Sequence, residues 1–155
     1  MNNQKENPLC TNELRDFFES HHDKLLCTAN KKGEPSAALM GTPRLNQEGN
    51  IELALSDDPS ITLNNILENK SVVFLVGYEA GLRARNYKGV RIYAEATEIL
   101  VEGDKLEMIR EKLRGRFGNE KADELVAIAT FSIKKLRPII DRGQLWNELP
   151  FGNNV

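Results

Sequence analysis

Residues 36–76 read SAALMGTPRLNQEGNIELALSDDPSITLNNILENKSVVFLV, and this stretch decides the fold. Apolar residues alternate within 36–45 and again within 50–56, a pattern typical of two β-strands. Residues 57–70 predict a short helix, and the apolar run 72–76 predicts a further strand. The stretch therefore predicts a strand, a strand, a short helix and a strand, in that order.

The start of this short helix offers what a phosphate group requires. Asp58 followed by Pro59 resembles a cap with proline at the first helical position, and Ser60 and Thr62 stand where the first turn begins. A phosphate dianion needs several donors, and the first turn of a helix supplies free backbone N–H groups and a favourable dipole. The same residues also fit a plain cap on a connector, since such residues cap helices generally. The motif alone leaves both interpretations open.

The N-terminal part of the chain predicts one helix and one hairpin. A helix is expected over 11–22, because Thr11 supplies a cap and apolar residues follow at helical spacing. The run KLLCTANKKGEPSAALMGTPRL, residues 24–45, predicts two strands that turn at Gly33, where glycine permits a positive φ angle. The strand 50–56 then continues the sheet in antiparallel order.

The C-terminal half predicts two long strands around a helix. VRIYAEATEILVE (90–102) alternates as a strand, and GDKLEMIREKLRGRFG (103–118) predicts a helix that stops at its final glycine. LVAIATFSIKKLRPIID (125–141) predicts a strand broken at Pro138, which cannot donate a ladder hydrogen bond. Six antiparallel strands of this size close into a small barrel, which removes exposed edges. The expected fold is mainly β with flanking helices (α+β), in a single domain over 1–155.

Composition narrows the classes of function. The chain has 155 residues and a net charge of −2, which disfavours attraction to nucleic acid or to anionic membranes. No segment is long and apolar enough to span a bilayer and the N-terminus has no apolar leader, so a cytoplasmic protein is expected. Cys10 and Cys27 are expected to be reduced, being too few for a disulfide framework or a zinc site. No metal site is expected, because the adjacent His21 and His22 would point about 100° apart on a helix.

The C-terminal tail, residues 141–155, differs from the rest of the chain. It carries the single tryptophan, Trp146, together with Phe151, in a stretch that also contains glycine and proline. Such a tail cannot bury itself, so Trp146 is expected to cover the mouth of its own barrel, a bound ring or a partner subunit.

Four segments have the order and spacing of a known family. They read LLCTANKKGEPSAALMGTPRL, IELALSDDPSITLNNILENKSVVFLV, GVRIYAEATEIL with GDKLEMIREKL, and IATFSIKKLRPIIDRGQLW. They include an LxTxxxxGxPxxA-like first hairpin and an N-[LI]-x-x-N-x-x-V-like helix exit at 65–72. From about Leu14 to Trp146 the chain resembles the FMN-binding split-barrel proteins related to pyridoxamine 5′-phosphate oxidase. The resemblance implies a six-stranded antiparallel split β-barrel.

The resemblance also implies a homodimer, with FMN in two equivalent grooves that are each lined by both chains. The implied cofactor-binding residues follow the flavin from its ring to its phosphate. Beside the isoalloxazine ring lie Met40, Gly41, Thr42 and Pro43, with Gly41 permitting close approach. Under the ribityl chain lie Leu55, Ser56 and Asp57. Around the phosphate lie Ser60, Thr62 and Asn65. Arg44, or Arg83 and Arg85, would supply positive charge, and Trp146 completes the set from the tail.

Two departures from the family pattern bear on function. Many members carry a lysine or arginine in the segment occupied here by 61–63, and this chain has none. The RxVxxK-type signature of the oxidase itself is also absent, so oxidation of pyridoxamine phosphate is not expected. The expected activity is an FMN-dependent oxidoreductase acting on a small-molecule substrate, in which the cofactor carries out the redox step and the protein positions it. A catalytic side chain is not identified.

Other functions remain open at this stage. The chain is also compatible with a non-catalytic flavin-binding electron carrier or redox sensor, or with a dimer that has lost the cofactor. Heme or a deazaflavin could occupy the same groove.

Overall fold

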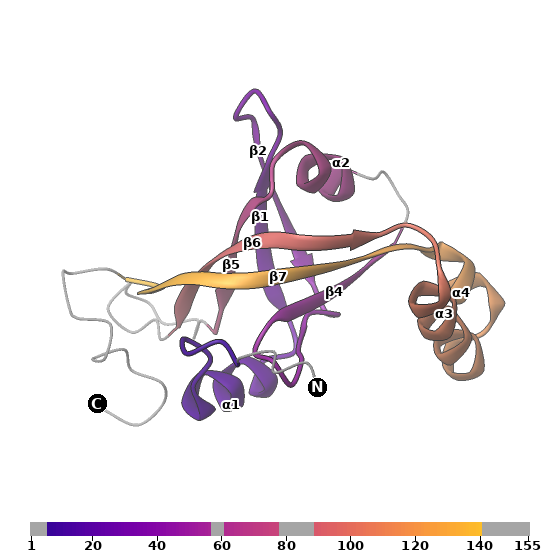
Figure 1. The fold of residues 1–155 in the computed structure, drawn as a ribbon, viewed down its shortest axis with the longest axis horizontal. Coiled ribbons are helices and arrows are strands. Elements are labelled where there is room, and N and C mark those ends of the chain that lie inside the picture. Colours follow the sequence, from indigo (N-terminus) through magenta and orange to yellow (C-terminus); the bar gives the residue numbers. More distant parts are fainter. Residues whose placement is uncertain (1–5, 57–60, 78–88, 141–155) are drawn as a thin grey trace, which may run out of the picture.

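The computed structural model describes residues 6–56, 61–77 and 89–140 (Figure 1). The helices are α1 (Asn12–Ser20), α2 (Ile61–Glu68), α3 (Asp104–Phe117) and α4 (Asn119–Glu124). The strands are β1 (Lys24–Ala29), β2 (Pro35–Met40), β3 (Arg44–Leu45), β4 (Ile51–Ser56), β5 (Ser71–Val76), β6 (Val90–Leu100) and β7 (Leu125–Pro138).

The strands form one antiparallel sheet in the order β2-β1-β5-β6-β7-β4-β3. The sheet is strongly coiled, so that β6 and β7 run across the direction of β1 and β2 (Figure 1). The side chains on its concave side form the main hydrophobic core, in which Phe74 and Phe131 meet edge to face with ring centroids 5.4 Å apart. This arrangement is the expected antiparallel split barrel with flanking helices.

The described residues contain seven strands rather than the six expected from the sequence. The predicted strand 36–45 is interrupted after Met40, and its last part becomes the two-residue strand β3. Pro43 explains the break, because proline has no N–H to donate to a ladder. We call residues 41–43 the β2–β3 link. Since β2 and β3 are the two edges of the sheet, this three-residue link must bring those edges together.

Helix α1 covers one end of the barrel. Thr11 caps it as expected, with Oγ1 accepting a hydrogen bond from the Leu14 N–H at 3.2 Å. Leu14 and Phe18 are fully buried in the core. The helix ends at Ser20, two residues before the expected limit, because His21 adopts extended backbone and its Nδ1 lies 2.8 Å from the Phe17 carbonyl oxygen.

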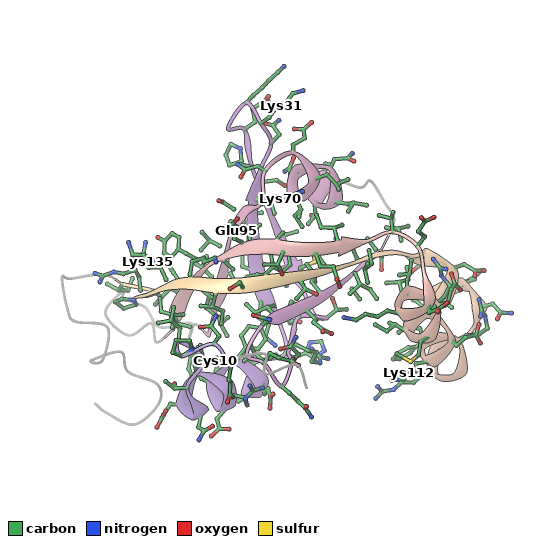
Figure 2. All side chains as sticks on the ribbon, in the orientation of Figure 1. Cys10, Lys31, Lys70, Glu95, Lys112 and Lys135 are labelled. Carbon is green, nitrogen blue, oxygen red and sulfur yellow. The ribbon has the colours of Figure 1, made fainter. Side chains whose placement is uncertain are left out.

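Helices α3 and α4 pack against the N-terminal end of β7 (Figure 1). Helix α3 stops before Gly118 as expected, where φ is 95° and the glycine N–H donates to the Arg114 carbonyl. Helix α4 was not expected from the sequence. An ion pair of 3.2 Å between Lys105 and Glu52 joins α3 to β4. Figure 2 shows Lys112 on α3 at the lower right of the view and Lys31 at the top, at the tip of the β1–β2 hairpin.

Strand β7 joins the two parts of the sheet. It pairs with β6 from Val90 to Leu100 and, on its other edge, with β4 from Ile51 to Ser56. It ends at Pro138, as the sequence predicted. Strand β7 thereby fixes the position of β4 relative to β6.

Candidate functional site

The β2–β3 link is held by hydrogen bonds to neighbouring backbone. Thr42 Oγ1 donates to the Ala54 carbonyl of β4 at 2.9 Å. Arg44 Nη1 donates to the carbonyls of Gly41 at 3.1 Å and Pro43 at 2.9 Å. The link therefore has a defined position against β4 although no strand ladder runs through it.

Gly41 lies against an imidazole ring. A Cβ atom at this position would stand 2.7 Å from His22 Cε1, closer than carbon atoms can approach. The group that lies against Gly41 in this structure is His22, an exposed side chain that follows α1. The close approach of a flavin ring to Gly41 stays a prediction. The neighbouring Met40 is half-buried and Pro43 is buried.

The start of α2 is tied to the barrel by a buried hydrogen bond. Asn65 Nδ2 donates to Thr28 Oγ1 at 3.0 Å, and both side chains are buried. Thr62, one turn earlier, is half-buried, and its hydroxyl has no hydrogen-bond partner among the described residues. Ser56, the last residue of β4, is exposed. Among the described residues these two hydroxyls have no partner, Thr62 where the resemblance implied the phosphate and Ser56 where it implied the ribityl chain.

Three of the predicted site residues, Thr42, Arg44 and Ser56, occupy successive positions along β4. Arg44 pairs with Glu52, Thr42 reaches Ala54, and Ser56 ends the strand before α2. From the level of Arg44 to Ser56 the strand rises about 13 Å over four residues. The Arg44 guanidinium is held at the link by the carbonyls of Gly41 and Pro43. The other predicted cations, Arg83 and Arg85, lie outside the described residues.

The remaining predicted site residues divide into two groups. Leu55 is 3% exposed, so its side chain belongs to the core and only its backbone can face a ligand. Asp57, Ser60 and Trp146, with the tail 141–155, lie outside the described residues.

A cavity of about 390 Å³ lies between the end of α1 and the β2–β3 link. Sequence analysis did not identify it, although it includes two of the predicted site residues, Pro43 and Arg44. Its most unusual member is Lys24 on β1, which is 1% exposed. Burial, with a smaller contribution from Arg44, lowers the pKa of Lys24 to about 8. The one available sequence signal was the alternation of side chains along a strand, which places Lys24 on the same side of β1 as Leu26.

A second cavity, of about 340 Å³, opens on the convex side of the sheet. It lies over β1, β5 and β6 and is lined by Cys27, Val73, Tyr93 and Glu95, among others. Burial raises the pKa of the Cys27 thiol. Neither of these two cavities is lined by Ser56 or Thr62.

The structure also bears on three other kinds of site: a basic patch, a metal site and a membrane-spanning helix. The basic residues of α3 face acidic neighbours: Arg110 pairs with Glu107, and Arg114 with Glu111 and with Asp123, the last at 3.3 Å. Within residues 6–56, 61–77 and 89–140, no group of three or more side chains is arranged to hold a metal ion. Nor does any helix in those ranges have the length and apolar character to cross a bilayer.

The sheet, its closing link and its flanking helices define a split-barrel protein. A family model described as pyridoxamine 5′-phosphate oxidase matches residues 10–140. This span is most of the chain, which therefore belongs to the pyridoxamine 5′-phosphate oxidase family, as the resemblance implied. No curated protein matches the sequence.

Solved structures share the fold at low sequence identity. An FMN-binding protein from Syntrophomonas wolfei has a TM-score of 0.66 and 20% identity, covering 85% of this chain and 86% of that chain. HutZ, the heme storage protein from Vibrio cholerae, has a TM-score of 0.61 and 17% identity, covering 83% and 94%. An F420 reductase has a TM-score of 0.58 and 14% identity, covering 79% and 94%. At these identities the similarity concerns the fold alone.

Proposed function

We propose that this protein is a cytoplasmic FMN-binding homodimer, with flavin-dependent oxidoreductase activity towards a small molecule. The observation that carries the proposal is the arrangement of three predicted site residues: Thr42 of the β2–β3 link is bonded to Ala54 on β4, Ser56 ends β4, and Thr62 lies in the first turn of α2. The flavin would supply the redox chemistry, and this chain would bind, orient and shield it.

The residues around α2 fit a flavin phosphate. Thr62 and Ser56 carry hydroxyls without partners among the described residues, and the first turn of α2 has backbone N–H groups that no helical carbonyl can accept. The bond from Asn65 to Thr28 keeps this turn in place. Hydroxyls and amides would thus hold the phosphate, and a compensating positive charge would come from a residue outside the first turn of α2.

The residues around the link fit a planar ring. Thr42 is fixed by its bond to Ala54, so its backbone groups have a set direction towards a neighbouring ligand. The exposed His22 ring now lies against Gly41. Rotation of that side chain would open the space above the glycine, and the flavin edge would take its place.

The proposed dimer uses the convex side of β2, β1 and β5. Edge strand β2 has no buried residue, and Leu39 is 59% exposed. The register sets apolar side chains in two adjacent rows, Leu39, Leu25 and Leu75 in one and Ala37, Cys27 and Val73 in the other. A second copy of the chain placed on this surface would cover it and would bring a second wall to each groove.

The absence of a lysine or arginine at 61–63 favours one second candidate. A groove without a phosphate cation is also suited to heme, which needs no phosphate site, and one protein of this fold is the heme storage protein HutZ. Heme binding is therefore retained as the alternative to FMN.

Titration of the purified protein distinguishes these candidates. FMN is expected to bind saturably, with one molecule per chain, and riboflavin is expected to bind at least about tenfold more weakly because it lacks the phosphate. Equal affinity for FMN and riboflavin would refute the phosphate site at α2. Binding of hemin but not FMN would support the alternative, and binding of neither would indicate that the cofactor has been lost. Steady-state turnover with a reduced nicotinamide then separates an enzyme from a flavin carrier.

A further inference from the structure

The cavity at the end of α1 contains a buried cation that has no counter-ion in the part of the chain that the structure describes. Lys24 is 1% exposed, and lysine is rarely buried without an opposite charge. Its Nζ has one acceptor among the described residues, the His22 carbonyl oxygen at 3.3 Å, and lies 4.4 Å from the centre of the Phe18 ring. These contacts leave two of the three ammonium N–H groups without an acceptor in that part of the chain.

A second cation faces the same cavity. Arg44 lines it, and Arg44 lowers the pKa of Lys24, as expected for two positive charges close together. Arg44 donates to two carbonyl oxygens of its own neighbourhood and, like Lys24, has no carboxylate within 4.0 Å in the described ranges.

The nearby acidic side chains have other partners. Glu19 lines the cavity, but it is about half exposed and lies 4.0 Å from Arg15. Asp23 is also exposed and lies 2.8 Å from His22 Nδ1. Asp23 and Glu19 raise the pKa of Lys24, but burial and Arg44 lower that pKa by more. The positive charge inside the cavity is therefore not balanced by the described residues.

We propose that this cavity binds the acidic group, a carboxylate or a phosphate, of a small molecule, with Lys24 and Arg44 as its cationic contacts. The bound oxyanion accepts hydrogen bonds from the Lys24 ammonium and from the Arg44 guanidinium, and it supplies the missing negative charge. The cavity volume of about 390 Å³ suits a small metabolite rather than a macromolecule.

This anion pocket is separate from the proposed flavin phosphate site. Lys24 begins β1, whereas Thr28, which bonds to α2, lies four residues later, about 13 Å along the strand. The pocket is next to the β2–β3 link, where the flavin ring is proposed to lie. Identifying the bound molecule as an acidic redox substrate rests on the proposed function. The anion pocket itself does not depend on that function.

Lysine side-chain NMR of the full-length protein tests the pocket. The Lys24 signal is assigned by its loss in Lys24→Met, and inorganic phosphate and acetate are titrated separately at constant ionic strength. A saturable shift of the Lys24 signal is expected with at least one of the two anions. Arg44→Gln, an exposed site that tolerates the change, is expected to weaken that binding about tenfold, while Lys32→Gln in the β1–β2 turn leaves it unchanged.

The contrary results are equally specific. No saturable shift with either anion, equal shifts at every lysine, or an unchanged titration in Arg44→Gln would overturn the proposal. The comparison of phosphate with acetate shows which acidic group the pocket prefers. A parallel FMN titration keeps the two proposals apart, because a protein that fails to bind FMN but shows the Lys24 shift retains the anion pocket.

Discussion

The hydrogen bond between Asn65 and Thr28 provides a quantitative test of how α2 is held. Thr28→Val keeps the side-chain shape but removes the acceptor, which leaves the buried Asn65 amide unpaired. An unsatisfied buried group costs about 1–3 kcal/mol. At roughly 3 °C per kcal/mol for a chain of this length, the melting temperature should fall by about 3–9 °C. Urea unfolding should give a lower midpoint with an unchanged m-value.

A double variant separates the lost bond from altered packing. Asn65→Leu combined with Thr28→Val removes both polar partners, so the pair should be more stable than the sum of the single changes predicts, by about 1 kcal/mol or more. Thr28→Ser retains the hydroxyl and serves as the control. Strictly additive effects of Thr28→Val and Asn65→Leu would refute the claim that this bond fixes α2.

Four further changes test other parts of the structure. Thr62→Val should weaken FMN binding by about 1.5–3 kcal/mol in a fluorescence titration, because it removes a phosphate donor. The lowered pKa of Lys24, about 8 in the folded chain, means that the unfolded chain binds more protons above that pH. The wild type should therefore gain stability relative to Lys24→Met as the pH of a urea unfolding series rises from 7 to 10. Gly77→Ala should destabilise by about 1–3 kcal/mol in the same assay, because φ is +70° and a Cβ would stand 2.3 Å from Phe17 Cζ. Leu39→Asp should convert the proposed dimer to a folded monomer in sedimentation velocity, because it places a charge on an exposed apolar surface.

Each of these predictions has a matched control or a contrary outcome. Thr62→Ser should bind FMN nearly as well as wild type, and equal loss in both variants would point to altered packing. Parallel pH profiles for wild type and Lys24→Met would show that Lys24 is not perturbed. For Gly77, a stable alanine variant would contradict the close contact with Phe17. A Leu39→Asp protein that remains dimeric would place the interface elsewhere.

The parts of the fold that were predicted correctly carry local signals. The turn at Gly33 has a φ of 80°, and a glycine at such a position is visible in sequence. Thr11 begins α1, Gly118 follows the end of α3 and Pro138 ends β7, all through the hydrogen bonds that each residue makes or cannot make with its neighbours.

The parts that were missed depend on contacts distant in sequence. Pro43 accounts for the break before β3, but the bond from Thr42 to Ala54 that positions the β2–β3 link is not revealed by the alternation of apolar residues. Helix α4 is six residues long and is stabilised by Ala122, whose burial depends on packing. The anion pocket appears only when α1 returns against β1 and places Phe18 beside Lys24.

The candidate site was predicted in part. The sequence order brought Thr62 and Asn65 to the start of one helix, and the structure places both there, with Asn65 bonded to the barrel. The sequence could not show that Arg44 lines the cavity at the end of α1, because the position of Arg44 depends on the pairing of β3 with β4. All the cofactor contacts stay predictions, and Asp57, Ser60 and Trp146 also lie outside the described residues.

A crystal structure of the protein soaked with FMN tests the central claim most directly. The account predicts density for the phosphate at Thr62 and the first turn of α2, density for the ring beside Gly41 and Thr42, and a second chain covering Leu39. A phosphate bound elsewhere, or a ring away from the β2–β3 link, would contradict it.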